Sequence, residues 1–307
     1  MASPLLWHHF FLQPCSWLLH SGPVRSLSTA DIRPLVRLAL EEDIGSGDVT
    51  TRTTVPAATP AKAAIVAREP LVVAGMAVAE EVFRRVSRRI QLRRLVADGQ
   101  HVSAGDRLLA LTGPARAILS AERVALNFLQ RLSGVATLTA RYVAAVRGTK
   151  ATILDTRKTT PGLRRLEKYA VRCGGGENHR FGLYDRVLIK DNHLATLRGA
   201  KPNPIAVAVA RARSRYPRLV VEVEADTLGQ VQEAVAAGAD VLLLDNMSSA
   251  RLREAVRRVA GRAKTEASGG VNLETVRQIA EAGVDFISVG ALTHSARAVD
   301  IALDFEM

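Results

Sequence analysis

Cysteines are scarce in this chain. Its 307 residues include two, Cys15 and Cys173, and a pair so far apart cannot form the multi-bridge framework of small secreted domains. A reducing compartment fits this usage, so we expect the protein in the cytoplasm.

Residues 1–30 contain no Asp or Glu and a single arginine, Arg25. We expect a leader or disordered tail there, with organelle targeting as the alternative.

Long apolar runs are also missing. A membrane-spanning helix needs about 20 mostly apolar residues, whereas the most apolar segment, residues 4–19, is broken by His8, His9, Gln13 and Pro14. We therefore expect no membrane span. A hydrophobic content of 48% is nevertheless ample for a large buried core, which argues against a disordered chain.

Aromatic residues are sparse although the chain is strongly basic. A formal net charge of +12 could indicate nucleic-acid binding through phosphate contacts, but an aromatic content of 4% leaves little to stack on bases. The sequence has no helix-turn-helix, zinc-ligand or RNP-like pattern. We expect most arginines, such as those at 83–89 and 251–258, to lie on solvated helix faces and a minority to bind small anions.

The first third of the ordered chain has the pattern of a small α+β domain. A helix is predicted to begin near Thr29, and residues 42–51 are rich in turn formers. Short β-prone runs at 64–67, 71–73, 91–96 and 108–111 surround one amphipathic helix at about 77–86. Strands grouped around a helix favour an α+β arrangement.

From about residue 152 the pattern becomes an alternation of strands and helices. Strands are predicted at 152–155, 187–190, 219–224, 241–245, 264–267 and 286–290, and the last four begin roughly 22 residues apart. Helices are predicted at 206–215, 228–237, 249–259 and 273–282. Continuous apolar strands indicate a parallel sheet buried on both faces. No G-x-G-x-x-G follows the first strand, which favours a closed or nearly closed barrel over a doubly wound sheet.

Polar side chains follow each of these strands. Basic residues come with the early strands, two acids, Glu224 and Asp245, end the middle ones, and Gly-rich segments end the last two. Because the carboxyl ends of barrel strands meet on one face, we expect an anion-binding half beside a carboxylate half that suits Mg²⁺ or sugar hydroxyls. The glycines let backbone amides approach a phosphate. Each feature also has a structural explanation: the acids can pair with Lys190, and the glycines can simply form turns.

Several long motifs make the chain resemble a known family from about Ile32 to the C-terminus. They are Glu42-Asp-Ile-Gly-Ser-Gly-Asp-Val-Thr50, Glu122-Arg-Val-Ala-Leu-Asn127 with Ser133-Gly134, Asp155-Thr-Arg-Lys-Thr-Thr-Pro-Gly162, Glu167-Lys-Tyr169, Lys190-Asp-Asn-His193, Leu244-Asp-Asn246 and Glu266-Ala-Ser-Gly-Gly270. The family they resemble is quinolinate phosphoribosyltransferase, also called carboxylating nicotinate-nucleotide pyrophosphorylase.

The resemblance implies an incomplete (open) TIM-like α/β barrel preceded by a smaller α+β sandwich domain. We place the leader at residues 1–30, the N-terminal domain at 31–134 and the barrel domain at 135–307, with a C-terminal helix packing back on the N-terminal domain. The resemblance also implies a homodimer, with higher oligomers left open, in which Arg123 reaches the neighbouring subunit's pocket. We expect neither a nucleic-acid nor a membrane partner.

The resemblance further implies an activity: transfer of phosphoribosyl from phosphoribosyl pyrophosphate to quinolinate, with loss of CO₂, in NAD biosynthesis. By position, the substrate-binding residues would be Arg123, Thr156, Arg157, Lys158, His179, Arg180, Lys190, Glu224, Asp245, Ser268, Gly269, Gly270, Val289, Gly290 and Ala291. Of these, Lys158, Lys190, Glu224 and Asp245 would be catalytic. Glu224 and Asp245 would also hold Mg²⁺, directly or through water.

Two other interpretations involve the same residues. A related transferase, such as the molybdenum-locus paralogues that resemble this family, would act on a different substrate; Arg123 and the pair His179-Arg180 favour quinolinate. A lyase could instead use Lys158 or Lys190 as a Schiff base, although neighbouring arginines favour this less than an apolar pocket would.

Overall fold

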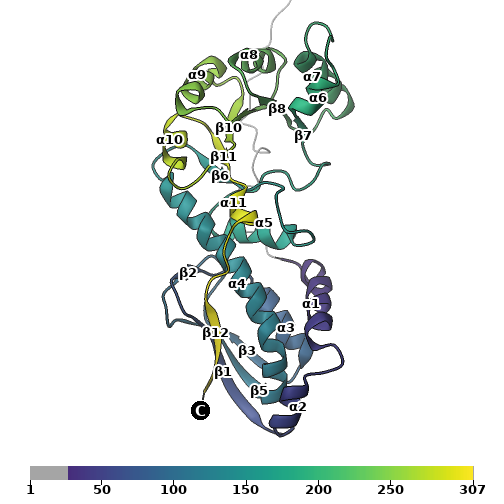
Figure 1. The fold of residues 1–307 in the computed structure, drawn as a ribbon, viewed down its shortest axis with the longest axis vertical. Coiled ribbons are helices and arrows are strands. Elements are labelled where there is room, and N and C mark those ends of the chain that lie inside the picture. Colours follow the sequence, from purple (N-terminus) through teal and green to yellow (C-terminus); the bar gives the residue numbers. More distant parts are fainter. Residues whose placement is uncertain (1–26, 307) are drawn as a thin grey trace, which may run out of the picture.

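The computed structural model describes residues 27–306, which form two lobes stacked along the long axis of the molecule (Figure 1). The predicted leader lies almost wholly outside the described residues. One helix of 31 residues, α4 (Ala115–Ala145), runs from the first lobe into the second. The predicted boundary between residues 134 and 135 falls inside this helix, so a rigid element connects the lobes. The domain limits themselves stay a prediction.

The N-terminal lobe packs helices on one face of a four-stranded antiparallel sheet, in the order β12-β1-β5-β3. The strands are β1 (Pro60–Ala67), β3 (Gln91–Arg94), β5 (Arg107–Pro114) and β12 (Ile301–Glu306); β2 (Leu71–Val72) and β4 (His101–Val102) form a separate pair. The helices are α1 (Thr29–Ile44), α2 (Val49–Thr54), α3 (Met76–Val86) and the first half of α4. Fully buried side chains such as Ile65, Phe83 and Leu111 form the core between the layers.

Local side-chain chemistry sets where the first helices begin. Ser28 and Asp31 form a capping box, in which the Asp31 carboxylate accepts from the Ser28 amide at 2.9 Å. Residues 42–51 were predicted as turns only, but α2 begins inside this segment. The Asp48 carboxylate accepts from the Thr51 amide at 2.9 Å and so caps a short helix that the turn-forming residues obscure.

The second lobe is an open barrel of six parallel strands in the order β6-β11-β10-β9-β8-β7. The strands are β6 (Thr152–Leu154), β7 (Val187–Ile189), β8 (Val221–Ala225), β9 (Val241–Asp245), β10 (Lys264–Ser268) and β11 (Phe286–Ser288). The helices are α5 (Arg164–Cys173), α6 (Asp191–Ala195), α7 (Pro204–Arg215), α8 (Leu228–Ala236), α9 (Ser249–Val259), α10 (Val276–Glu281) and α11 (Ala291–His294). β6 and β7 are the two edges of the sheet, so the prediction of an open barrel is confirmed.

The predicted C-terminal helix is wrong, although its return to the N-terminal lobe is right. Residues Ile301–Glu306 form β12, which pairs antiparallel with β1 from Ala67↔Ile301 to Lys62↔Glu306. Six residues are too few for a stable helix on their own, whereas the exposed edge of β1 offers a row of backbone partners.

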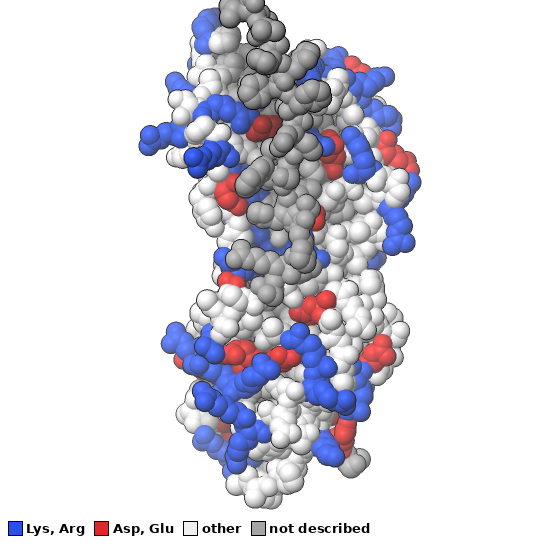
Figure 2. Space-filling model, turned by 180° about the vertical axis from the view of Figure 1, so that it is seen from behind, with Lys and Arg blue, Asp and Glu red and all other residues white. Residues whose placement is uncertain are grey.

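Basic side chains are spread over both lobes with acidic ones between them on the face that Figure 2 shows. Several of the helix-face arginines pair with acids on their own helix, such as Arg84 with Glu80 and Arg258 with Glu254 at 3.1 and 2.8 Å. This agrees with the predicted solvated faces. Among the described residues, no helix combines the length and the apolar composition needed to cross a membrane.

Candidate active site

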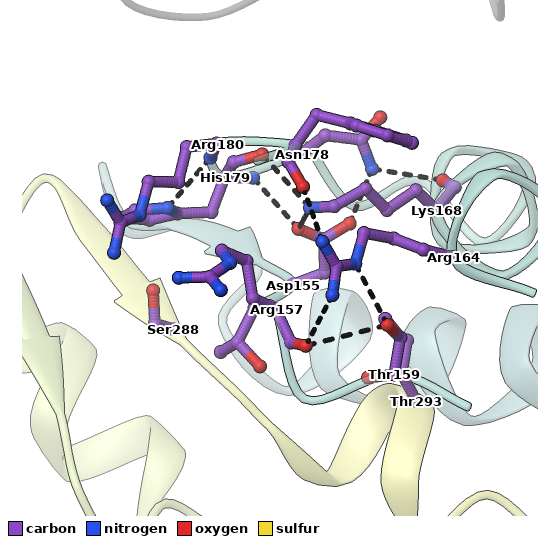
Figure 3. Close-up of polar contacts among 12 residues, drawn as sticks. Asp155, Arg157, Thr159, Arg164, Lys168, Asn178, His179, Arg180, Ser288 and Thr293 are labelled. Atoms are coloured by element: carbon purple, nitrogen blue, oxygen red, sulfur yellow. Dashed lines mark hydrogen bonds and ion pairs between the residues drawn. The ribbon is translucent and has the colours of Figure 1, made fainter. Parts of the chain in front are cut away.

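The loops that follow β6 and precede β7 are fixed from below by one buried carboxylate. Asp155 is fully buried, and it accepts from the Asn178 side chain at 2.6 Å, from the His179 amide at 2.9 Å and from Lys168 of α5 (Figure 3). Lys168 also donates to the His179 carbonyl at 3.0 Å. The motif residues Asp155 and Lys168 therefore shape the site without being part of its surface.

A second clamp comes from Arg164 at the start of α5. Its guanidinium donates to Thr159 Oγ1 at 3.0 Å, to the Phe181 carbonyl at 2.9 Å and to the Arg157 carbonyl at 3.4 Å (Figure 3). One side chain thus ties together the two loops that carry Arg157 and Arg180. Neither clamp was assigned a role from the sequence, although Lys168 lies in a motif noted there.

Arg157 and Arg180 point toward the same space from these two loops (Figure 3). The pKa of the Arg180 guanidinium is lowered, first by partial burial and then by the charge of Arg157. Arg157 Nε is buried and has no hydrogen-bond partner among the described residues. Two cations that repel each other, one with an unused donor, form a site that an anion stabilises.

The carboxylate half lies at the ends of two neighbouring strands. Glu224 of β8 accepts from Lys190 at 2.5 Å, and Asp245 ends β9 next to it in the sheet. Asp245 accepts from the Asn246 side chain at 2.6 Å. The pairing of Lys190 with Glu224, considered above as a structural alternative, is present.

Glycines follow β10 and β11 at the barrel mouth. Gly269 has φ +92°, and a Cβ there would lie 2.1 Å from Asn246 Oδ1, so only glycine fits. The amides of Gly269, Gly270, Gly290 and Ala291 donate no hydrogen bond within the described residues. Val289 differs, because it is buried and its amide donates to the Leu154 carbonyl at 2.9 Å. Its predicted phosphate contact therefore has no free amide to make it.

Lys158 connects the first strand to the last. Its carbonyl accepts from Thr293 Oγ1 at 2.7 Å, and a Cβ on Gly290 would lie 3.1 Å from the Lys158 side chain. Thr156 supports the same turn, with its hydroxyl accepting from the Lys158 amide at 3.0 Å. Lys158 is exposed and lies beside Gly290, whose backbone amide makes no hydrogen bond within the described residues.

Two domain profiles match the chain over nearly its whole ordered length. Residues 48–133 match "Quinolinate phosphoribosyl transferase, N-terminal domain", and residues 135–304 match the corresponding C-terminal domain. The chain belongs to the quinolinate phosphoribosyltransferase family.

Individual family members agree over most of their length. The nicotinate-nucleotide pyrophosphorylase [carboxylating] of Mycobacterium leprae is 47% identical over 89% of this chain and 96% of its own. The chloroplastic enzyme of Arabidopsis thaliana is 42% identical over 91% of this chain and 84% of its own. The solved nicotinate-nucleotide pyrophosphorylase of Francisella tularensis superimposes with a TM-score of 0.88 at 40% identity, covering 93% of this chain and 100% of its own.

Within this member of the quinolinate phosphoribosyltransferase family, His179 is buried beneath the barrel mouth, whereas it was predicted to bind substrate. Its Nδ1 accepts from the Arg180 amide at 2.7 Å, and its Nε2 lies 3.1 Å from Glu222 and 3.4 Å from Glu266. Both ring nitrogens are therefore occupied by protein groups. Sequence reasoning assigned no role to Glu222 or to Glu266. The alternation of strand side chains could have revealed both, since each lies two residues before a predicted site residue.

Arg123 lies apart from the other predicted site residues. It is exposed on α4 and makes no hydrogen bond or ion pair within the described part of the chain. Arg131, farther along α4, donates to the Ala296 carbonyl at 2.6 Å and to Glu167 of α5 at 2.7 Å. Eight residues of helix correspond to about 12 Å along α4, which separates Arg123 from Arg131 and its contacts.

Proposed function

We propose that this mouth is where the chain transfers a phosphoribosyl group from phosphoribosyl pyrophosphate to quinolinate. The products are nicotinate mononucleotide, pyrophosphate and CO₂, on the route to NAD. The observation that supports the assignment is that Arg157 and Arg180 point toward the same space (Figure 3). The ends of other strands in the same barrel carry Lys190 paired with Glu224, Asp245 and free backbone amides. A doubly negative ring and a sugar phosphate together match this distribution of charge.

The positive half binds the acid. Arg157 and Arg180 present guanidinium groups that bind carboxylates with two parallel hydrogen bonds, and the two loops that carry them are tied by Arg164. Lys158 lies beside the amides of Gly290 and Ala291, where it would neutralise phosphate oxygens of the second substrate. Binding both substrates in fixed orientation converts a bimolecular encounter into a unimolecular step.

In the transfer step the ring nitrogen attacks the anomeric carbon of the ribose. A carbon–nitrogen bond forms, and the bond to the pyrophosphate oxygen breaks, with its electron pair leaving on pyrophosphate. Glu224 and Asp245 face the ribose, where negative charge stabilises the developing oxocarbenium ion, while the cations stabilise the leaving group.

The decarboxylation follows from the product of the first step. Attachment leaves the ring nitrogen cationic, and the adjacent carboxylate departs as CO₂ while its electron pair stays on the ring carbon next to that nitrogen. The carbanion then takes up a proton. Arg157 and Arg180 hold the ring through this step, since their loops are tied by the buried carboxylate of Asp155 and by the guanidinium of Arg164.

We also propose a Mg²⁺ ion at Glu224 and Asp245. Carboxylates at neighbouring strand ends suit an ion that keeps several waters and is shared with substrate phosphates. The ion would neutralise pyrophosphate as it leaves. Measuring the turnover of the wild type and of Asp245→Asn against Mg²⁺ concentration tests this, and an unchanged Mg²⁺ requirement in the variant would remove Asp245 from the site.

The proposed assembly is a homodimer in which Arg123 completes the partner's pocket. Its support is the exposure of Arg123 and its lack of partners within the described residues. An exposed arginine without a partner in its own chain is free to bind an anion held by a second subunit.

We propose the cytoplasm as the compartment, in keeping with the free, buried thiol of Cys173. The names of the Arabidopsis and Nicotiana tabacum relatives place them in the chloroplast and the mitochondrion. A fluorescent fusion at the C-terminus, made with and without residues 1–30, tests the compartment, and import that depends on these residues would contradict the proposal.

One assay tests the activity itself. Quinolinate carrying a labelled carboxylate next to the ring nitrogen is mixed with phosphoribosyl pyrophosphate, Mg²⁺ and enzyme, and both labelled CO₂ and pyrophosphate are measured. We expect equal amounts of the two products. Pyrophosphate released with nicotinate but not with quinolinate would assign the chain to a different acceptor.

A further inference from the structure

A buried polar layer lies directly under the mouth of the barrel. Glu222, Glu266 and Ser288 each lie two residues before a mouth residue, namely Glu224, Ser268 and Gly290. Because strand side chains alternate, each buried residue faces the same side as the mouth residue above it. Glu222 and Glu266 are fully buried, and Ser288 is 5% exposed. Figure 3 shows Ser288 near the guanidinium of Arg157.

The hydrogen bonds of His179 fix where its proton lies. A nitrogen that accepts a hydrogen bond carries no proton, and Nδ1 accepts from the Arg180 amide at 2.7 Å. The ring is then neutral, with its proton on Nε2. That proton faces two carboxyl groups, Glu222 at 3.1 Å and Glu266 at 3.4 Å.

The two carboxyl groups differ in their other partners. Glu222 lies 3.1 Å from Arg186, a buried cation that balances its charge. Glu266 accepts from the Ser288 hydroxyl, and its second oxygen is buried with no partner among the described residues. With Arg186 balancing Glu222 and His179 neutral, an ionised Glu266 would leave one uncompensated charge in the barrel interior. Such a charge is costly unless the group takes up a proton.

The direction of the pKa of Glu266 agrees with a proton on this carboxyl group. Burial, followed by the charge of Glu222, raises the pKa of Glu266 to about 7. For His179, burial lowers the pKa, but the charges of Glu266 and Glu222 outweigh burial and raise it overall. The hydrogen bond from the Arg180 amide to Nδ1 is therefore what opposes a second proton on the ring.

The same three side chains could be taken for a metal site, since one ligand atom from each of His179, Glu222 and Glu266 lies within 4.8 Å of the others. Two contacts argue against it. His179 Nε2 carries the proton that a metal would have to replace, because Nδ1 is the accepting nitrogen. Arg186 already supplies the positive charge beside Glu222.

We propose that Glu266 is a positioning residue that stays protonated and, with Glu222, holds His179 as a neutral imidazole so that the Arg180 amide is fixed at the pocket. This rests on the proposed function, in which Arg180 binds a substrate carboxylate. A proton on His179 Nδ1 would break the bond to the Arg180 amide. A charge on Glu266 would place a second anion under Arg157 and Arg180, and so weaken their hold on an acid.

The experiment compares three variants by quinolinate affinity, measured by calorimetry, and by kcat/KM from pH 6 to 9. Glu266→Leu removes both oxygens, Glu266→Gln keeps a neutral side chain that still accepts from Ser288, and Glu281→Gln changes an exposed acid on α10 as the control. We expect Glu266→Leu to weaken quinolinate binding by roughly 10- to 100-fold, Glu266→Gln to restore most of it, and the control to match the wild type.

The pH profile separates positioning from a merely structural role. In the wild type, kcat/KM should fall about tenfold per unit as pH rises above the pKa of the free enzyme's Glu266, and in Glu266→Gln this fall should be absent. The infrared carbonyl stretch of a protonated carboxylic acid should be present in the wild type at pH 6 and lost in Glu266→Gln. Should Glu266→Leu fail to fold, the profile and the infrared band of Glu266→Gln decide the matter.

Three results would overturn the inference. They are a wild type without the infrared band, a Glu266→Gln profile with an unchanged alkaline fall, and a Glu266→Gln variant that is folded but as defective as Glu266→Leu. Failure of the proposed function is distinct from these. In that case the wild type would bind no quinolinate at any pH, while the infrared band, which needs no substrate, would still report the state of Glu266.

Discussion

Lys168 and Asp155 form a buried ion pair beneath the loops that carry Arg157 and Arg180. Burial alone lowers the pKa of Lys168 and raises that of Asp155, while the contact between them acts in the opposite sense on each. The pair is further satisfied by the Asn178 side chain and by the amide and carbonyl of His179. The fold therefore keeps charge in its interior in order to fix the shape of a surface pocket.

Removing Lys168 should destabilise the protein strongly. In Lys168→Met the Asp155 carboxylate keeps its burial but loses its cation, and breaking such a pair costs about 3–5 kcal/mol. Urea unfolding followed by circular dichroism measures the change. The control is Lys150→Met, which removes a side chain that is 55% exposed and 3.4 Å from Asp285, and should cost less than about 1 kcal/mol. Equal losses in the two variants would show that burial does not set the cost.

Arg180→Ala should lower the activity of the protein without lowering its stability. The loss of a bidentate carboxylate contact should lower kcat/KM for quinolinate by about 100-fold or more, or roughly 2.7 kcal/mol. Because burial and Arg157 both lower the pKa of Arg180 in the free protein, its removal should leave the melting temperature unchanged or slightly higher. Arg253→Ala, on the exposed face of α9, is the matched control. A variant with near-normal kcat/KM would exclude Arg180 from the pocket.

Lys158→Ala should also lower kcat/KM for quinolinate, and a near-normal value would exclude Lys158 from the pocket.

Mixing two inactive variants tests whether the pocket is shared. If Arg123 acts in the partner's site and Lys190 in its own, an Arg123→Ala subunit paired with a Lys190→Ala subunit forms one intact site and one doubly defective site. Random exchange at equal concentrations should restore about a quarter of the wild-type activity. Mixing Lys158→Ala with Lys190→Ala should restore none, since both residues belong to one barrel. Equal recovery in the two mixtures, or none in either, would contradict the shared pocket.

The raised pKa of Glu266 predicts how stability depends on pH. The folded protein keeps this proton up to about pH 7, whereas the unfolded chain releases it near its ordinary pKa of about 4.3. Between these values the folded state binds more protons, so stability should fall as pH rises, by about 4 kcal/mol in all. Glu266→Gln should lack this component. Urea unfolding at pH 4.5, 6 and 7.5 measures it, and parallel curves for the two proteins would refute the shift.

Glu222 acts in the opposite sense over a lower range of pH. Its pKa is lowered to about 2, so its contribution to stability is present above the unfolded value and is lost as pH falls toward 2. The two acids thus have separate windows, and the comparison with Glu266→Gln is best made above pH 4.5.

The sequence by itself determined the order of strands and helices and which side chains end each strand. The strands predicted at 241–245 and 264–267 correspond to β9 and β10 almost residue for residue. Because the carboxyl ends of parallel strands share one face, the strand order alone was enough to group Lys190, Glu224 and Asp245. The same pattern, together with the motifs, was sufficient to indicate the family.

Only the tertiary structure decided which groups lie under that face and how the chain ends. The tautomer of His179 depends on Glu222 and Glu266, which come from strands 44 residues apart and meet through the register of the barrel. The clamps of Lys168 and Arg164 likewise join loops that are separate in sequence. Residues Ile301–Glu306 became a strand because β1 offered an open edge. Burial and non-local pairing set these outcomes, and neither is encoded in a local pattern.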